Sequence, residues 1–377
     1  MLLARGLSGR EERHNIEVTV ATATAQGTFD DSALPFRVER RPGLPRLCRL
    51  VREADVIHLA GPAVAPLFFS VMLRKQVIAE HHGYQAICPN GLLLYGPTKT
   101  ACPDRFMSRQ YLKCARCNSV ESGWMRSFRL LLATWVRRQL CKSATVNMSV
   151  SQHVAQRLRL PRSTVMYYGV SDSGTAPETA GSGGTQSRSS LLTIGYLGRL
   201  VEEKGVPTLL EAVRHMRAEN LPIMLKVIGD GPLRNGLEAA AGENGLRGNV
   251  TFTGMLQGEA LREAANSLDL LVLPSVWEEP AALVIMEQLS RGRPLIVTDN
   301  GGSPELVGDA GLTFPPGDVA ALVKCLRRFL DDPGLVTELG KRARQRAQTL
   351  FLDERTVIEH GEVFERLGSK NTEFRRS

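Results

Sequence analysis

The chain has 377 residues, of which 43% are hydrophobic and 23% charged, which fits two globular domains and excludes a disordered, collagen-like or coiled-coil protein. No run approaches the roughly 20 consecutive apolar residues that span a bilayer, and the first residues lack the apolar core of a secretory signal, so we expect a cytoplasmic protein. The net charge of +8 is uneven, because residues 1–175 hold 24 Lys and Arg against 12 Asp and Glu, whereas residues 176–377 hold 23 against 27.

The basic N-terminal half suits an anionic partner, such as phospholipid headgroups or a phosphate-bearing acceptor. Nucleic acid is the competing interpretation, but the sequence has no RNA-binding motif of aromatic and basic residues and no Cys/His finger spacing. We therefore expect no nucleic-acid partner. A basic surface that merely faces solvent explains the charge equally well and stays open.

Residues 1–170 are predicted to form an α/β domain whose alternation is somewhat irregular. Apolar runs predict strands at residues 16–21, 56–59, 77–80, 145–150 and 164–167, and helical spacing predicts helices at 44–53, 65–73 and 122–142. Between residues 82 and 121 lies a span of about forty residues with little periodicity. A loop of that length inside a compact domain is unusual unless something holds it in place.

Residues 171–190 include a stretch rich in Gly, Ser and Thr without apolar periodicity, which predicts a flexible linker. The chain then alternates regularly. Strands are predicted at residues 191–196, 223–228, 250–252, 270–273 and 295–298, and helices at 208–217, 233–243, 259–267 and 282–291. This alternation is typical of a doubly wound α/β domain with a parallel sheet.

The first candidate binding segment follows the predicted strand at 191–196. Gly198 and Arg199 come shortly after that strand, and Lys204 precedes the next helix. Cations at the carboxyl end of a parallel strand suit a diphosphate, although this segment alone fits an ordinary exposed turn about equally well. Gly229 opens a turn after the strand at 223–228, which taken by itself is structural.

Two further segments follow the strands at 270–273 and 295–298. Glu279 lies in the loop after the first of them and Glu287 lies inside the next helix, where each carboxylate can accept hydrogen bonds from sugar or ribose hydroxyls. Two glutamates exposed to solvent are the plain alternative. After the second strand, Gly301 and Gly302 let the backbone approach a ligand closely, and Ser303 is predicted to cap a helix whose free N–H groups favour phosphate.

In this order, at the ends of successive strands, these elements resemble the family 4 retaining glycosyltransferases of the GT-B fold, whose C-terminal part is the glycosyltransferase group 1 domain. The resemblance implies an α/β protein with two Rossmann-like, doubly wound domains that face a central cleft. It implies an acceptor domain at residues 1–170, a linker at 171–190, a donor-binding domain at 191–350, and a segment at 351–377 with a helix that returns to the first domain and a tail.

The resemblance also implies roles for individual residues. The family's phosphate-binding Arg and Lys align with Arg199 and Lys204, its paired glutamates with Glu279 and Glu287, and its Gly-Gly loop with the two glycines named above. The implied donor-binding set is Gly198, Arg199, Lys204, Gly229, Glu279, Ala281, Ala282, Leu283, Glu287, Gly301 and Gly302. The implied catalytic set is Arg199, Lys204, Glu279 and His82.

The N-terminal half matches the family more loosely. His82 resembles the family's strand-end histidine before the acceptor cleft, although a lone histidine is more often a packing residue. We expect the family's first strand and Gly-rich loop to be missing from this sequence, because Met1 is predicted to fall within the helix that follows them. A misassigned start, a truncated chain and a protein that works without this strand stay open as explanations. Two local departures are Tyr168, where the family has Asn, and Pro280-Ala281-Ala282, where it has Gly-Phe-Gly.

The irregular span holds four of the seven cysteines, namely Cys88, Cys102, Cys114 and Cys117. Disulfides are not expected in a cytosolic chain, whereas four thiolates could hold one tetrahedral Zn²⁺ and fix the span in place. Thiols without a metal are the alternative, since only one C-x2-C spacing is present. We expect a structural zinc here.

The resemblance implies a hexosyltransferase that moves a sugar from a nucleoside-diphosphate sugar to an acceptor hydroxyl with retained anomeric configuration, in cell-envelope, exopolysaccharide or glycolipid synthesis. It implies no cofactor for catalysis, because Arg199 and Lys204 stabilise the leaving diphosphate. One alternative is an inactive sugar-nucleotide-binding or partner-binding protein that lacks the Gly-rich loop. Another is a sugar-nucleotide epimerase, which the spacing of Glu279 and Glu287 disfavours.

The predicted helix at 122–142 interleaves leucines and Trp135 with arginines, as helices at a membrane interface do. Packing of the same leucines against a sheet is the other interpretation. The first interpretation places the protein peripherally at the inner face of the plasma membrane, in contact with anionic lipid, with a sugar or lipid-linked sugar as acceptor.

Overall fold

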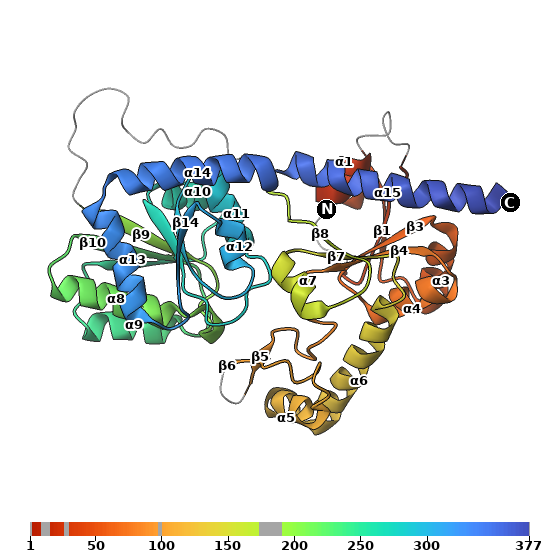
Figure 1. Cartoon of the computed structure of the whole chain (residues 1–377), viewed down its shortest axis with the longest axis horizontal. Helices are drawn as coiled ribbons and strands as arrows, with labels where there is room; N and C mark the ends of the chain where they lie inside the picture. The colour runs from red at the N-terminus through yellow and green to blue at the C-terminus, as the bar shows by residue number, and fades with distance from the viewer. Residues whose placement is uncertain (1, 9–15, 26–29, 97–99, 173–190, 377) are drawn as a thin grey trace. The chain divides into compact units, whose positions relative to one another are not determined.

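The computed structural model describes residues 2–8, 16–25, 30–96, 100–172 and 191–376 (Figure 1). The chain divides into two compact units. Unit 1 comprises Met1–Leu92, Asp104–Gly169 and Leu352–Ser377, and unit 2 comprises Leu93–Pro103 and Val170–Phe351. Most of the predicted linker, residues 173–190, lies outside the described residues.

Unit 2 is built on a parallel sheet with the strand order β11-β10-β9-β12-β13-β14. These strands are β9 (Leu192–Leu197), β10 (Ile223–Ile228), β11 (Val250–Gly254), β12 (Leu270–Leu273), β13 (Leu295–Thr298) and β14 (Gly311–Phe314). Every residue of β12 and β13 is buried, as expected for strands covered on both faces. The five strands predicted from apolar runs are confirmed, and β14 is an additional edge strand.

The helices of unit 2 follow the strands in alternation. They are α8 (Val206–Ala218), α9 (Arg234–Glu243), α10 (Gly258–Asn266), α11 (Leu283–Ser290), α12 (Ser303–Val307), α13 (Val319–Asp331) and α14 (Gly334–Leu350), preceded by the short 3₁₀ helix η2 (Glu202–Lys204). In α8, Leu209, Val213 and Met216 recur every three or four residues and are buried, which fixes the face that packs. Helix α8 packs against α13, and α11 packs against α14.

The strand order of unit 2 reverses at β9. From β9 the chain adds β10 and then β11 on one side, and afterwards crosses to add β12, β13 and β14 on the other. Strands β9 and β12 are therefore neighbours although residues 198–269 separate them in the chain. In doubly wound sheets the carboxyl ends of two such strands form the usual ligand position.

Unit 1 contains a parallel sheet in the order β3-β4-β7-β8 and a separate parallel pair, β1-β2. The strands are β1 (Thr19–Thr22), β2 (Arg37–Arg40), β3 (Val56–Ala60), β4 (Gln76–His81), β7 (Val146–Ser149) and β8 (Ser163–Val165). The helices are α1 (Leu2–Ser8), α3 (Leu44–Glu53), α4 (Val64–Met72), α5 (Tyr111–Ser122), α6 (Trp124–Cys141), α7 (Gln152–Leu158) and α15 (Asp353–Arg376).

The last helix belongs to unit 1 and completes its core. Val363 and Leu367 of α15 join Ile78 of β4, Met148 of β7 and Met166 in one buried cluster. Apolar burial of this kind contributes roughly 25 cal/mol per Å². Helix α15 thus packs on the sheet formed by much earlier residues, including β3 and β4.

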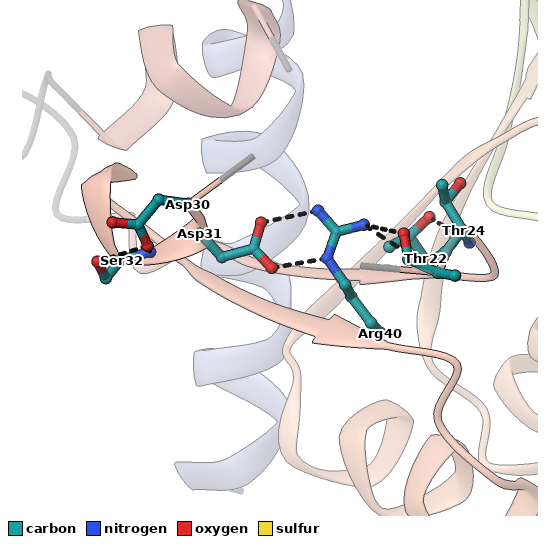
Figure 2. A network of polar contacts seen from close by, with 7 residues as sticks. Thr22, Thr24, Asp30, Asp31, Ser32 and Arg40 are labelled. Carbon is teal, nitrogen blue, oxygen red and sulfur yellow. Dashed lines mark hydrogen bonds and ion pairs between the residues drawn. The ribbon is translucent and has the colours of Figure 1, made fainter. Parts of the chain in front are cut away.

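The guanidinium of Arg40 adds side-chain hydrogen bonds to the backbone pairing of β1 and β2. Arg40 of β2 donates from Nε and Nη2 to the two carboxylate oxygens of Asp31, at 2.6 and 2.7 Å (Figure 2). Its Nη1 donates to the carbonyl of Ala25 at 3.0 Å, beyond the end of β1. The bidentate geometry ties the 3₁₀ helix η1 (Asp31–Ala33) to the strand that follows it.

The span between residues 82 and 121 is less irregular than expected. Two-residue strands β5 (Leu94–Tyr95) and β6 (Thr100–Ala101) pair in it, and residues 111–122 form α5. Helix α5 was not predicted, because its buried residues are small or polar and give no apolar periodicity. These residues are Cys114, Ala115, Cys117 and Asn118. The predicted helix at 122–142 begins only at Trp124, because Gly123 with φ +74° separates α5 from α6.

His81 is the most deeply buried titratable group at the end of β4. Its side chain is fully buried, and Nε2 lies 2.9 Å from Oδ1 of Asn147, whose amide nitrogen donates to the carbonyls of Cys141 and Pro161. Since that amide oxygen only accepts, Nε2 of His81 carries the proton. Burial lowers the pKa of His81 to about 4.

We therefore expect unit 1 to lose stability as the pH falls from about 6.5 to about 4. Across that window the unfolded imidazole takes up a proton and the folded one does not, which corresponds to about 3 kcal/mol. His81→Gln keeps a donor and does not titrate, so its free energy of unfolding should fall less over the same window. Denaturant unfolding at several pH values measures both slopes. Identical slopes would show that His81 is not responsible.

Candidate functional site

Three neighbouring strands of unit 2 deliver the predicted donor-binding residues to one edge of the sheet. Arg199 follows β9, Glu279 follows β12 and Gly301 follows β13, and these strands lie side by side in parallel. Gly229 follows β10, the neighbour of β9 on its other side. These segments lie up to about a hundred residues apart in the sequence. In the fold they all lie at the carboxyl ends of the strands, where the strand order reverses.

The centre of this edge is a buried ion pair. Nζ of Lys204, at the end of η2, lies 2.5 Å from Oε1 of Glu279, and the two side chains are only 18% and 7% exposed. The hydroxyl of Ser275 donates to the same carboxylate oxygen at 2.6 Å. The ammonium also lies 5.6 Å from the ring centre of Trp277. Lys204 is therefore held in one place by a carboxylate and an aromatic face.

Glycines let the loops of this edge approach one another. A Cβ on Gly301, whose φ is +67°, would lie 2.5 Å from the backbone nitrogen of Glu279. A Cβ on Gly229 would lie 1.9 Å from the carbonyl oxygen of Gly198. The amide of Gly302 donates to the carbonyl of Glu279 at 2.6 Å. No larger residue fits at either close approach without a backbone shift.

The cap of α12 differs from the prediction. Gly302 is the N-cap, and Ser303 is the first residue of the helix rather than its cap. The carbonyl of Gly302 accepts the first helical hydrogen bond, from the amide of Leu306 at 3.1 Å, so the helix starts one residue earlier than predicted.

Arg199 is the exposed cation of the site. Its side chain is 65% exposed, and Nη2 lies 3.5 Å from a carboxylate oxygen of Glu203. The hydroxyl of Tyr196 donates to the carbonyl of Arg199 at 2.7 Å, and burial raises the pKa of this phenol, so it remains a donor. The backbone of Arg199 is thus fixed, while its guanidinium faces solvent.

The remaining predicted donor-binding residues lie along the start of α11. Ala281 and Ala282 are half-buried just before the helix. Leu283 and Glu287 are exposed, and their spacing of four residues places both on one face of the helix. An exposed leucine beside an exposed carboxylate suits a flat apolar ring and a ribose hydroxyl.

Two further polar atoms at this edge were not predicted from the sequence. Nε1 of Trp277 and Oδ1 of Asn300 are buried and have no hydrogen-bond partner within the described residues. Buried polar groups are nearly always paired, so these atoms mark positions where a ligand or water completes the site. The sequence did indicate that Trp277 lies in a loop directly after a buried strand, which is a typical position for a ligand-binding residue.

In unit 1 the predicted residue His82 lies directly after β4. Its Nδ1 is 2.6 Å from the hydroxyl oxygen of Tyr168, and the two rings stack with centres 5.5 Å apart. Its Nε2 is 3.8 Å from Oε2 of Glu80. His82 therefore has a partly exposed imidazole oriented by two neighbours, and Tyr168, noted from the sequence only as a departure, is one of them.

The four cysteines of the 82–121 span are divided between the units. Cys88, Cys114 and Cys117 belong to unit 1 and are buried, whereas Cys102 belongs to unit 2 and is half-buried. Cys114 and Cys117 lie three residues apart on α5, so their thiols share a helix face. That placement suits two ligands to one ion.

Comparison with known proteins finds one family model that matches the C-terminal part of the chain. Residues 184–346 match the family model described as Glycosyl transferases group 1. The chain is 35% identical over 150 residues to alpha-D-kanosaminyltransferase of Streptomyces kanamyceticus, which is 39% of each chain. It is 30% identical over 228 residues to glycogen synthase of Mycobacterium tuberculosis, which is 59% of this chain and 53% of that one. The matches thus span about two fifths to one half of these relatives.

Among solved structures, the chain is similar to Anabaena HepE in complex with UDP-glucose. The TM-score is 0.67 with 16% identity, over 97% of this chain and 95% of the other. At this identity the likeness concerns the fold, and the fold is GT-B with two Rossmann-like domains.

The close approach at Gly301 predicts a specific loss of stability. Gly301→Ala should destabilise unit 2 clearly more than Gly245→Ala. Both positions have a positive φ, near +70°, which costs about 1–2 kcal/mol for a residue with a side chain, but a Cβ on Gly245 meets nothing within 4 Å. Denaturant unfolding of the two variants measures the difference. Equal losses would mean that the loops after β12 and β13 are not packed as described.

Proposed function

We propose that this chain, in which residues 184–346 are a glycosyltransferase group 1 domain within a GT-B fold, is a retaining hexosyltransferase that uses a nucleoside-diphosphate sugar. The observation that carries the proposal is the Lys204–Glu279 pair, braced by Ser275, at the carboxyl ends of β9 and β12. A fixed ammonium at the reversal of strand order suits the diphosphate of such a donor.

The chemistry assigned to these residues is stabilisation of the leaving group. As the bond between sugar and diphosphate breaks, negative charge grows on the diphosphate, and cations already in place stabilise that charge without reorganisation. Lys204 is held in place by Glu279. Arg199 precedes it by five residues and has an exposed guanidinium, which is free to bind the phosphates of a donor. Glu287 is assigned to the ribose and Glu279 to the transferred sugar.

His82 is the catalytic candidate of unit 1. Tyr168 and Glu80 orient its imidazole, and a partly exposed ring can contact an acceptor or donor hydroxyl. We assign the donor to the UDP-sugars, supported by the UDP-glucose bound to the similar HepE. We also assign a polysaccharide or glycolipid acceptor, and the similarity to glycogen synthase, whose name indicates a polysaccharide product, supports the first of these.

Lys204→Gln tests the assignment of the diphosphate site. The amide keeps a donor for Glu279 but removes the charge, so turnover of a UDP-sugar should fall by ~10²-fold or more while unit 2 stays folded. Lys226→Gln, a lysine on β10 whose Nζ donates to Ser267, is the control and should retain turnover. Turnover is measured as UDP release, and folding by circular dichroism. Wild-type turnover in Lys204→Gln would refute the assignment.

We also propose, from the sequence pattern of four cysteines in the 82–121 span, one structural zinc ion whose ligands within unit 1 are Cys88, Cys114 and Cys117. The shared face of Cys114 and Cys117 on α5 supports this, because two sulfur atoms one helical turn apart can bind the same ion. Protein purified without chelator should contain zinc with a thiolate signature, and Cys114→Ser with Cys117→Ser should remove it. Cobalt substitution, followed by the intense near-ultraviolet band of cobalt thiolates, is the measurement. A substituted wild-type protein without that band would contradict the proposal.

The helices α5 and α6 support a peripheral membrane contact. Trp124, Phe128, Leu132 and Trp135 of α6 recur every three or four residues and are each about half exposed or more. Such a continuous exposed apolar stripe is unusual on a soluble surface. None of the described helices has the length and hydrophobicity of a bilayer-spanning segment.

The charge around the stripe selects anionic lipid as its partner. Lys113 and Arg116 of α5 and Arg126 and Arg129 of α6 are all exposed. The two helices pack against each other, and the hydroxyl of Ser127 donates to the carbonyl of Ala115 at 2.6 Å. Aromatic side chains together with cations match an interface of acyl chains and phosphate headgroups, where each cation contributes about 1 kcal/mol.

Replacing Trp124, Phe128 and Leu132 together by Ser should weaken binding to anionic liposomes by about tenfold or more, because three apolar side chains no longer enter the interface. The side chains are exposed, so the fold should survive. Co-sedimentation at low and high salt is the measurement, and Met255→Ser, an exposed apolar residue of unit 2, is the control. Equal binding of wild type and triple variant, or binding of neither, would exclude the contact.

A further inference from the structure

Three side chains from distant parts of the chain meet inside unit 1, and the proposed reaction uses only one of them, Glu80, as a neighbour of His82. His58 lies on β3, Glu80 on β4 and His360 on α15, and each places one possible ligand atom within 4.8 Å of the other two. Nε2 of His58 is 2.9 Å from Oε2 of Glu80. The side chains of this pair are 16% and 11% exposed, and His360 is 3% exposed.

The ring of His360 has a defined protonation pattern. Its Nδ1 lies 2.8 Å from the carbonyl oxygen of Thr356, one turn earlier in α15. Because a carbonyl only accepts, Nδ1 carries the proton and Nε2 holds a lone pair. That Nε2 is fully buried and has no hydrogen-bond partner in the part of the chain that the structure describes. A ring whose other N–H is bound by a carbonyl is typical of histidines that bind metals.

The charges at this cluster suit a cation. Burial alone would raise the pKa of Glu80, but the hydrogen bond from His58 holds it below its ordinary value. Burial lowers the pKa of His360. Near neutral pH the cluster thus offers a carboxylate and a neutral imidazole, the forms in which these groups bind metals.

We propose that His58, Glu80 and His360 bind one divalent transition-metal ion of the zinc class. Two imidazole nitrogens and one carboxylate oxygen suit zinc, whereas calcium and magnesium prefer oxygen ligands alone. Three protein ligands leave a fourth position for water. A purely hydrogen-bonded cluster is the competing interpretation, and it leaves Nε2 of His360 unsatisfied.

Such an ion has two consequences for unit 1. It ties α15 to β3 and β4, which adds a polar link to the apolar packing of Val363 and Leu367. It also neutralises Glu80, whose carboxylate lies 3.8 Å from Nε2 of His82. Metal binding therefore changes the electrostatic surroundings of the candidate residue at the end of β4.

The experiment compares zinc and cobalt binding by wild type and His360→Phe, after chelator treatment of the whole protein. Phe retains a ring beside His58 but offers no ligand. Wild type should bind one more equivalent than the variant, or bind it at least about 100-fold more tightly, since even the outer partners of metal ligands contribute 10–100-fold. The near-ultraviolet cobalt–thiolate band should be the same in both, because the lost ligand is a nitrogen, which keeps this site separate from the cysteines.

His153→Phe makes the same change at a histidine of unit 1 outside the cluster and should bind zinc as wild type does. Zinc should also raise the melting temperature of wild type and of His153→Phe more than that of His360→Phe. If His360→Phe does not fold, Glu80→Gln, which removes the anionic ligand and keeps the size, should show the same loss. Equal stoichiometry and affinity in wild type and the folded variant would overturn the proposal.

Discussion

The buried ion pair between Lys204 and Glu279 is the interaction on which the candidate site depends. Its partners lie 75 residues apart in sequence and meet only because the order of strands reverses between β9 and β12. Removing one member of such a pair without a replacement hydrogen bond typically costs 3–5 kcal/mol, since the other charge stays buried alone. Ser275 shares the carboxylate, and the backbone of Gly302 binds the same loop. In unit 2 the strand order therefore determines where the charges of the candidate site lie.

In unit 1 three consecutive residues at the end of β4, residues 80–82, lie in different environments. Successive side chains of a strand point to opposite faces, so Glu80 and His82 share one face and contact each other, while His81 points to the other and binds Asn147. Burial makes His81 a neutral structural group, whereas His82 stays partly exposed. The single Tyr168 then orients His82 from the loop after β8.

The sequence predicted the regular part of unit 2 well, because parallel strands buried on both faces read as continuous apolar runs. It could not show that Lys204 pairs with Glu279, since that contact depends on strand order. Helix α5 was not predicted, because cysteines and Asn118 rather than larger apolar residues form its buried face. The partnership of Glu80 with His58 and His360 was also hidden, because α15 comes from the far end of the chain. Residues that act through long-range contacts need the fold before they can be recognised.

The central claim is that the edge formed after β9, β12 and β13 binds a nucleoside diphosphate through Arg199 and Lys204. Calorimetric titration with UDP and with uridine measures this directly, and ADP and GDP extend it to other bases. The account predicts that wild type binds one diphosphate much more tightly than its nucleoside, and that Arg199→Ala with Lys204→Gln removes most of this preference, because charge-assisted contacts carry it. Equal affinity of the double variant and wild type for the diphosphate would contradict it.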